Sequence, residues 1–415
     1  MRPPVQRHVV GLTTNYPTVS VQSVNSLNIP CTGGVDRPAR PVCSTYAGEV
    51  SPEPHSAPVP SAHTFLSDRI RGCLLGGAFG DAAAHAHPEA AGLSITADTQ
   101  LALYSMDGLQ EAIEWANEGL GADETACIWL AYLRWLGSRG LPLPEAGLVP
   151  QPRPIDAEPL LRDSSGAPEA SLDPEVLAAL STGEMGTRQR PVNTAGSSPA
   201  PLVRSAPFGL LPYVGTETVY KLSLDAASLT HGHPAARHAA AVFASMVHGL
   251  LVSGATLRDA AVAAVERAGQ VPADDGGAPG LVDRLRAVLS SGADDAGETA
   301  DGNAARARTA TAEDALAAGL QAALEVADRT GGDRTGGERT AADKGQEGSA
   351  GLAAAAVRRA AEKGGAPAAV VAGSLLGTLY GPEALPEAEA LREYSVIEKL
   401  AAAFVAATIA PSGPE

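Results

Sequence analysis

The chain has 415 residues, enough for one large domain or for two or three ordinary ones, and its 45% hydrophobic content supplies a substantial core. Aromatic residues make up only 4%, whereas alanine and glycine are abundant, which favours tightly packed helices over a β-sandwich. The formal net charge of −17 would repel nucleic acid and anionic membranes, so we expect neither as a partner.

The N-terminal residues 1–62 are rich in proline, serine, threonine and valine and show no clear periodicity. We expect a mostly disordered extension, with a serine-rich regulatory tail as the alternative. Residues 1–30 have no apolar h-region, so no secretory signal is expected. The four cysteines form neither a CxxC pair nor a zinc spacing, which is typical of a reduced intracellular protein. We therefore expect a cytoplasmic monomer.

The fold is predicted to begin near Ser67, where Ser67 or Asp68 can cap a helix through residue 80. Glycines recur every four residues in this helix and again near the other end of the chain, and each run forms a stripe without side chains. We expect the two stripes to pack together; the alternative is that each packs against an unrelated neighbour. The stripes are Gly72, Gly76 and Gly80, and Gly373, Gly377 and Gly381.

Apolar residues at helical spacing predict most of the remaining elements. The clearest helix has Pro234 at a favourable first-turn position and Gly254 as its stop signal. The predicted ranges are 99–120, 124–137, 174–181, 234–252, 255–268, 280–290, 311–328, 350–363, 366–380 and 394–410.

Three segments lack such periodicity. Residues 141–200 carry many prolines, serines and glycines and are predicted to form a loop-rich insertion. Residues 291–310 and 328–349 are solvated low-complexity sequence, for which a flexible loop is expected. No convincing run of alternating strands occurs, so the sequence predicts one all-α domain over residues 63–412.

Four motifs stand in order along this domain, and two further segments at residues 134–136 and 204–212 accompany them. The motifs are Arg69-Ile70-Arg71-Gly72-Cys73-Leu74-Leu75-Gly76-Gly77-Ala78-Phe79-Gly80-Asp81, Thr96-Ala97-Asp98-Thr99-Gln100, Leu229-Thr230-His231-Gly232-His233-Pro234 and Ala372-Gly373-Ser374-Leu375-Leu376-Gly377-Thr378-Leu379-Tyr380-Gly381. Together these segments resemble the ADP-ribosylglycohydrolase family over roughly residues 65–410. The resemblance implies an all-α, orthogonal multi-helix bundle that cleaves the glycosidic bond between ADP-ribose and a protein side chain.

The resemblance also implies a site for two magnesium ions, sometimes manganese, held by oxygen ligands. Thr96 and Asp98 match ligand positions, but Ala97 stands where a ligand carboxylate is expected. The other half of the site corresponds to residues 364–369, which contain neither an acid nor a hydroxyl. We therefore expect metal to bind weakly or not at all. In the alternative without metal, Asp98 caps a helix beginning at Thr99.

Four further residues are candidates for catalysis or substrate binding. Glu89 is the nearest match to an acid close to the scissile bond, although it is displaced by about one residue, and Asp81 ends the first motif. By resemblance, His231 and Arg204 are expected to contact the substrate. The alternatives are that Asp81 braces a helix end and that His231 enters a helix hydrogen-bonded with Thr230. His238 and His248 are expected at the surface or partly buried.

From these observations we expect the protein to be a divergent member of the family that keeps the family's structure but hydrolyses ADP-ribosyl linkages poorly. ADP-ribose or an ADP-ribosylated protein is the expected partner. One alternative is an inactive pseudoenzyme that binds ADP-ribose or a protein. Another is a working hydrolase that uses one metal ion or none, with Glu89 or Asp81 as general base.

Overall fold

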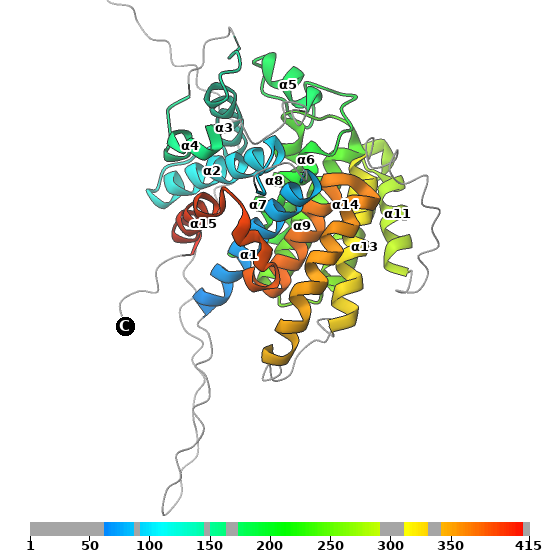
Figure 1. Cartoon of the computed structure of the whole chain (residues 1–415). Coiled ribbons are helices and arrows are strands. Elements are labelled where there is room, and N and C mark those ends of the chain that lie inside the picture. Colours follow the sequence, from blue (N-terminus) through cyan, green and yellow to red (C-terminus); the bar gives the residue numbers. More distant parts are fainter. Residues whose placement is uncertain are drawn as a thin grey trace, which may run out of the picture. The chain divides into compact units, whose positions relative to one another are not determined.

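A computed structural model describes residues 62–86, 92–144, 150–162, 173–290, 311–330 and 342–409. Glu89, the predicted extension up to residue 61 and the segment 291–310 lie outside these residues. Helices form all the regular structure of the described part, in which the only β-type pairing is an isolated bridge between Leu93 and Leu391 (Figure 1). The predicted all-α class is confirmed.

The two glycine stripes pack against each other, as predicted. The first stripe lies on α1 (Ala62–Ala84), and Gly373 and Gly377 lie on the second half of α14 (Ala342–Tyr380), while Gly381 directly follows its end. The two helices run side by side in Figure 1. A Cβ atom built on Gly76 would lie 2.1 Å from the carbonyl oxygen of Gly373, and one on Gly377 would lie 1.9 Å from that of Gly72. Only glycine permits this approach of two backbones, so the stripes join the two ends of the domain.

The long helix α14 is interrupted at Gly365, whose backbone has a φ of 73°. The break separates two helical segments at the place where the sequence predicted separate helices over 350–363 and 366–380. The first segment already begins at Ala342, within the predicted low-complexity stretch 328–349, and the preceding helix ends at Thr330. Residues 364–369, which correspond to the second half of the implied metal site, therefore span the kink between these two helical segments.

The other helices surround this pair (Figure 1). The first helix begins at Ala62, so the prediction that Ser67 or Asp68 caps it is wrong: both residues lie within its second turn. A helix over residues 216–228 was not predicted. The remaining elements are α2 (Ala97–Asn117), α3 (Glu124–Ser138), η1 (Pro154–Ala157), α4 (Pro159–Arg162), α5 (Pro174–Ser181), α6 (Ala200–Val203), α7 (Ala206–Gly209), α8 (Thr216–Ser228), α9 (Pro234–Val252), α10 (Leu257–Gly269), η3 (Ala273–Asp275), α11 (Pro279–Ser290), α13 (Ala312–Thr330), η5 (Pro382–Ala384), η6 (Pro386–Ala390) and α15 (Tyr394–Thr408).

The helix α9 lies at the centre of the core. It begins at Pro234, and Gly254 follows its end with a φ of 59°, as the sequence predicted. Its length and apolarity would suffice to cross a membrane, but 83% of the apolar window is buried inside the fold, which is typical of a core helix. His238 and His248 are both buried, so the prediction of surface or partly buried positions is wrong. Each ring is hydrogen-bonded to a backbone carbonyl, which makes its burial tolerable.

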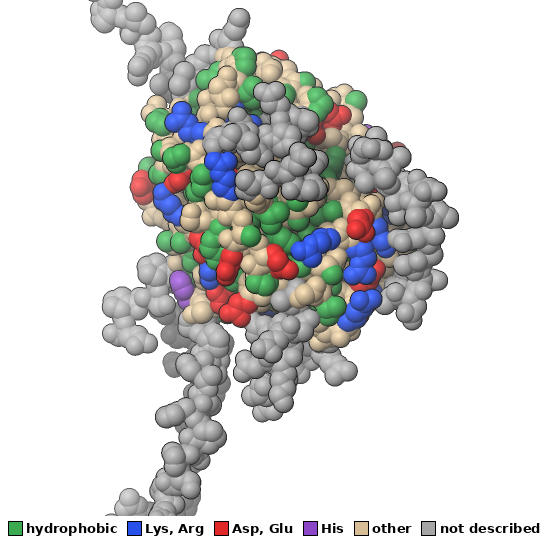
Figure 2. Space-filling view, in the orientation of Figure 1, with side chains coloured by type: hydrophobic (Ala, Val, Ile, Leu, Met, Phe, Trp, Pro, Cys, Tyr) green, Lys and Arg blue, Asp and Glu red, His purple; other side chains and the backbone are tan. Residues whose placement is uncertain are grey.

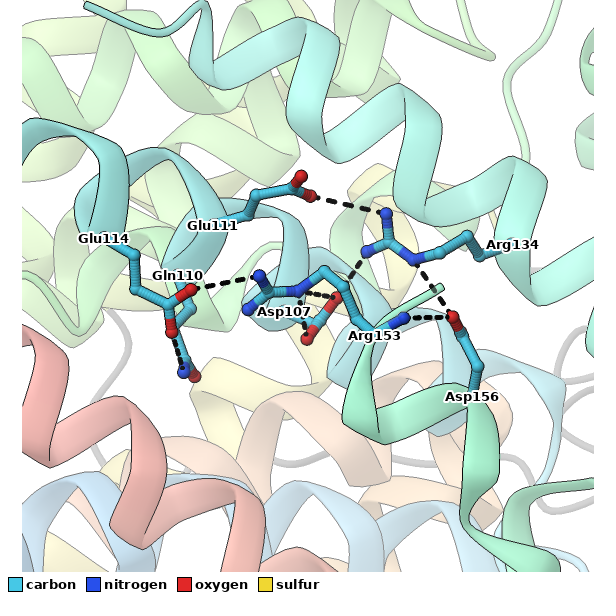
Figure 3. A network of polar contacts seen from close by, with 7 residues as sticks. All are labelled: Asp107, Gln110, Glu111, Glu114, Arg134, Arg153 and Asp156. Carbon is cyan, nitrogen blue, oxygen red and sulfur yellow. Dashed lines mark hydrogen bonds and ion pairs between the residues drawn. The ribbon is translucent and has the colours of Figure 1, made fainter. Parts of the chain in front are cut away.

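A charged network fastens the start of the insertion to α2 and α3 (Figure 3). The buried guanidinium of Arg134 on α3 forms an ion pair with Asp107 on α2 and lies 3.3 Å from a Glu111 oxygen. Arg153, just before η1, places its Nε 3.0 Å from Asp107, and its backbone N–H donates to Asp156 at 2.7 Å. These contacts hold residues 153–156 against the core, although the sequence predicted only loop there.

The surface carries both signs of charge. On the face shown in Figure 2, acidic and basic side chains lie beside each other among apolar and neutral ones. The excess of acidic residues in the chain is therefore not gathered into a single acidic patch on this face.

Candidate functional site

The buried carboxylate of Asp81 joins the C-terminal part of α1 to the start of α2. It accepts hydrogen bonds from the backbone N–H of Thr96 at 2.7 Å and from the hydroxyls of Thr96 and Thr99 at 2.9 and 2.6 Å. The Nδ1 of His85, one turn further along α1, lies 3.2 Å from Oδ1 of Asp81, the oxygen that also accepts from the Thr96 hydroxyl. Hydrogen bonding to Asp81 raises the pKa of His85 to about 9, so its ring is charged at neutral pH. Asp81 thus positions its neighbours, and a catalytic role for it stays a prediction.

The side chain of Thr96 caps α2. Its hydroxyl accepts a hydrogen bond from the backbone N–H of Asp98 at 3.3 Å, and the helix begins at Ala97. The alternative in which Asp98 caps a helix starting at Thr99 is therefore wrong. Asp98 lies in the first turn instead, where its carboxyl is not needed as a cap.

The carboxyl of Asp98 lies in an acidic setting. Burial raises the pKa of Asp98 to about 7, and the negative charges of Asp81 and Asp173 act in the same direction. The positive charges of His85 and Arg204 oppose this rise without cancelling it. A pKa raised toward neutrality suits a residue that gives or takes a proton.

Replacement of this carboxyl should change how stability depends on pH. The pKa of Asp98 in the folded state lies above its unfolded value of 3.8. The contribution of Asp98 to the free energy of unfolding is therefore fully present below pH 4 and is lost as pH rises through 7. Asp98→Asn should therefore raise the free energy of unfolding by roughly 1–3 kcal/mol at pH 8, with little change at pH 4. Urea denaturation at pH 4, 6 and 8 measures this difference. The exposed control Asp283→Asn should show no such trend, and a parallel response of both variants would contradict the assignment.

A second cluster forms around His231, which is fully buried at the entrance to α9. Its Nδ1 lies 2.8 Å from the hydroxyl of Thr230, and its Nε2 lies 2.7 Å from the hydroxyl of Ser198 and 3.1 Å from a Glu175 oxygen. The Ser198 hydroxyl donates to Asp173 at 2.5 Å. The predicted hydrogen bond between Thr230 and His231 is present, and three residues of the insertion complete the cluster.

Hydrogen-bond directions define the state of this histidine. Burial, followed by the charge of Arg204, lowers the pKa of His231 to about 3, against the opposing charge of Asp173, so the ring is neutral. Arg204 donates to the Thr230 hydroxyl, which leaves that hydroxyl free to donate to Nδ1. The ring hydrogen then lies on Nε2, which faces the Ser198 hydroxyl at 2.7 Å and the Glu175 carboxylate at 3.1 Å.

Arg204 extends from the same cluster and is 1% exposed. Its guanidinium lies 5.0 Å from the centroid of the Tyr132 ring, and its Nη2 donates to Thr230. Its Nη1 is buried and has no hydrogen-bond partner among the described residues. A buried donor without an acceptor costs about 1–3 kcal/mol, so this atom is suited to an oxygen of a bound molecule.

Asp173, Glu175 and Ser198 were missed by the sequence analysis. The helix predicted over 174–181 is confirmed as α5, and Asp173 caps it by accepting from the N–H groups of Glu175 and Val176. The local signal, an Asp followed by Pro174, was present in the sequence. The approach of this cap to His231 is tertiary and leaves no local signal.

The family's two-magnesium site does not fit the residues present. Ala97 is buried in the core, as are Ala368 and Ala369 in the segment that should supply the second half of the ligands. Only Thr96 and Asp98 remain at the predicted ligand positions, and the Thr96 hydroxyl already donates to Asp81. Two divalent cations need several oxygen ligands with negative charge, which these residues do not supply.

One metal ion has a better candidate set in Asp173, Glu175 and His231, whose ligand atoms all lie within 4.8 Å of one another. Two carboxylates and an imidazole suit a transition metal such as zinc or manganese better than magnesium. The hydrogen on Nε2 of His231 would have to leave first, because the ion needs its lone pair. The same oxygens are already satisfied by Ser198 and by the α5 cap, so the cluster is also complete without an ion.

Comparisons with known proteins agree with the fold and with the family that the sequence resembles. The profile of the ADP-ribosylglycohydrolase family matches residues 62–413, which is most of the chain. No curated protein matches the sequence. A solved chain described as an "ADP-ribosylglycohydrolase-related protein complex" is similar with a TM-score of 0.52 and 23% identity, over 83% of this chain and 99% of that chain. This structural likeness shows the shared fold, and the match to the profile shows that the chain belongs to the ADP-ribosylglycohydrolase family.

Proposed function

We propose that this protein binds ADP-ribose, free or attached to a protein side chain, and that it has little of the two-magnesium hydrolase activity of its family. The observation that carries the proposal is the buried Nη1 of Arg204, which has no hydrogen-bond partner in the described part of the chain. A phosphate or ribose oxygen would satisfy this donor. A guanidinium is well suited to such oxygens because its charge strengthens the hydrogen bond.

The surroundings of Arg204 support the same ligand. Its charge acts on both Asp98 and His231, which places these groups in one electrostatic neighbourhood. Hydroxyl groups of a ribose can donate to the carboxylate form of Asp98, while phosphate oxygens accept from Arg204. A buried site with a fixed cation and a titrating acid is thus suited to a polar, anionic molecule.

The missing carboxylates support the loss of metal-dependent hydrolysis. At Ala97 and in residues 364–369, apolar groups stand where the family resemblance places ligand oxygens. Without those oxygens, magnesium would remain hydrated rather than enter the site. The nearby guanidinium of Arg204 also opposes the entry of a second positive charge.

A second candidate function is hydrolysis without the metal pair. Its support is the pKa of Asp98 at about 7, which leaves a fraction of protonated acid at neutral pH. An acid of that kind can protonate the leaving group of a glycosidic bond. In this case turnover would persist in a chelator and would fall with Asp98→Asn.

Calorimetric titration with ADP-ribose, in magnesium and in a chelator, tests the proposal. We expect binding of equal strength in both, and weakening of about tenfold or more in Arg204→Lys, because lysine lacks the planar fork. Arg358→Met, which removes an exposed charge, is the matched control. Thermal denaturation of each variant separates lost binding from lost folding. Binding that requires magnesium, or robust magnesium-dependent release of ADP-ribose from a modified protein, would overturn the proposal.

Restoration of the metal ligands is expected to need both halves of the site. Ala97→Asp alone should not produce magnesium-dependent release of ADP-ribose, since residues 365–368 still offer no carboxylate. An Asp-Thr-Asp-Thr segment rebuilt into that loop, combined with Ala97→Asp, is the minimum that supplies ligands for two ions. Release of ADP-ribose measured against the unmodified chain checks this result. Activity from Ala97→Asp alone would show that other acids complete the site.

A further inference from the structure

A cavity of about 420 Å³ lies at the junction of α8, α9 and the link between α10 and α11. None of its lining residues belongs to the Asp98 and His231 clusters. The lining carries four basic side chains, Arg188, Lys221, Arg237 and Arg267, and one acidic side chain, Asp275, which is exposed. This excess of positive charge stands out in a chain whose net charge is −17.

The walls of the cavity are held in place by contacts that do not involve a ligand. The ring of His238 lies 2.6 Å from the Tyr220 hydroxyl and 3.1 Å from the Gly276 carbonyl oxygen, which ties α9 to α8 and to the link after α10. Arg267 bonds Glu217 at 2.6 and 2.9 Å and lies 4.6 Å from the centroid of the Tyr220 ring. The cavity is therefore largely preformed, as ligand sites usually are.

The charge in this cavity is incompletely balanced at Arg237. Arg188 is paired with Asp225 at 2.5 Å, and Arg237 donates through Nη1 to the Arg188 carbonyl oxygen at 3.3 Å. The Nε of Arg237 is buried and has no hydrogen-bond partner among the described residues. Burial and then the charge of Arg188 lower the pKa of Arg237, and Asp225 only partly opposes this. The carboxylate of Asp225 is thus the acidic group that acts on both guanidinium groups, those of Arg188 and Arg237.

We propose that this cavity binds a phosphate-bearing anion through Arg237 and Arg188. Guanidinium groups match phosphate oxygens in geometry and charge, and an anion in the cavity would supply the missing negative charge beside Arg237. The volume exceeds that of a single phosphate, and Leu224 and Val271 provide an apolar wall for an attached group. The inference is independent of the proposed function because it uses none of the residues of that site.

Calorimetric titration with inorganic phosphate, pyrophosphate and ADP at constant ionic strength tests this cavity. We expect saturable binding of at least one anion, and weakening of about tenfold or more in Arg237→Met. The control Arg358→Met removes the same charge from an exposed position and should bind as the unmodified chain does. Binding of inorganic phosphate or pyrophosphate would identify a free anion as sufficient, whereas binding of ADP alone would show that the attached nucleoside is needed.

Arg204→Lys separates the two sites, since it should leave binding of these anions unchanged while ADP-ribose binding falls. The thermal midpoint supplies a second readout: the anion should raise it in the unmodified chain and in Arg358→Met, but not in Arg237→Met. The proposal is overturned if none of the three anions binds, or if Arg237→Met binds as tightly as the unmodified chain.

Discussion

Gly377→Ala is expected to lower the free energy of unfolding by about 3–5 kcal/mol, or to prevent folding, although it adds only one methyl group. The new Cβ atom would lie 1.9 Å from the carbonyl oxygen of Gly72 and 2.5 Å from its carbonyl carbon. Both atoms belong to the backbone of a buried helix, so no side chain can rotate away. The two helices would have to separate along their whole contact, which would expose buried apolar surface.

Gly351→Ala is the matched control in the same helix. A Cβ atom at Gly351 meets nothing within 4 Å, so alanine there should raise stability by roughly 0.5–1 kcal/mol through helix propensity. Urea denaturation followed by circular dichroism measures both changes. Equal effects of the two substitutions would show that the close approach of α1 and α14 does not govern stability.

Arg134→Met should be nearly as damaging, with an expected loss of about 3–5 kcal/mol. Methionine keeps most of the volume of the arginine side chain but carries no charge. Asp107 would keep Arg153 as its remaining cation, and Glu111 would lose its ion pair with Arg134 (Figure 3). Burial already raises the pKa of Asp107 above its ordinary value, with Arg153 and Arg134 opposing. Without Arg134 this pKa should rise further, so the loss of stability should be smaller at acidic pH.

A double-mutant cycle tests whether the loss comes from the buried charge. Adding Asp107→Asn to Arg134→Met removes the unbalanced carboxylate and should recover part of the lost stability. The exposed Arg358→Met should cost no more than about 0.5 kcal/mol, since its pair with Glu387 spans 4.0 Å at the surface. If the double variant is as unstable as the sum of the two single variants predicts, the charge network is not a coupled unit.

The sequence predicted those parts of the fold that local signals determine. The two glycine stripes indicated a contact between distant helices because glycines at every fourth position lie on one face of a helix, where another backbone can approach closely. Pro234 and Gly254 marked the ends of α9 because each favours a particular backbone conformation. By contrast, the helix over residues 216–228 was missed: its first half mixes threonine, valine and tyrosine with charged residues, which disguises the helical pattern.

The roles expected for the candidate site residues stay predictions. The structure shows that Thr96 contacts Asp81 and that the charge of Arg204 acts on Asp98. Thr230 was predicted as a partner of His231, but the insertion residues of this cluster were not, because Asp173 and Glu175 approach it from a segment without clear periodicity. Such contacts depend on how the insertion packs, and a single sequence contains no local pattern that encodes them.

The pairing of α1 with α14 has a consequence for synthesis of the protein on the ribosome. The glycine stripe of α1 ends at Gly80, but its partner is completed only at Gly381, some 300 residues later. At 5–20 residues per second, the first helix must wait on the order of 15–60 seconds before its partner emerges. Throughout that interval the glycine face of α1 lacks its native partner, although α2, α7 and α9, which also contact α1, are synthesised earlier.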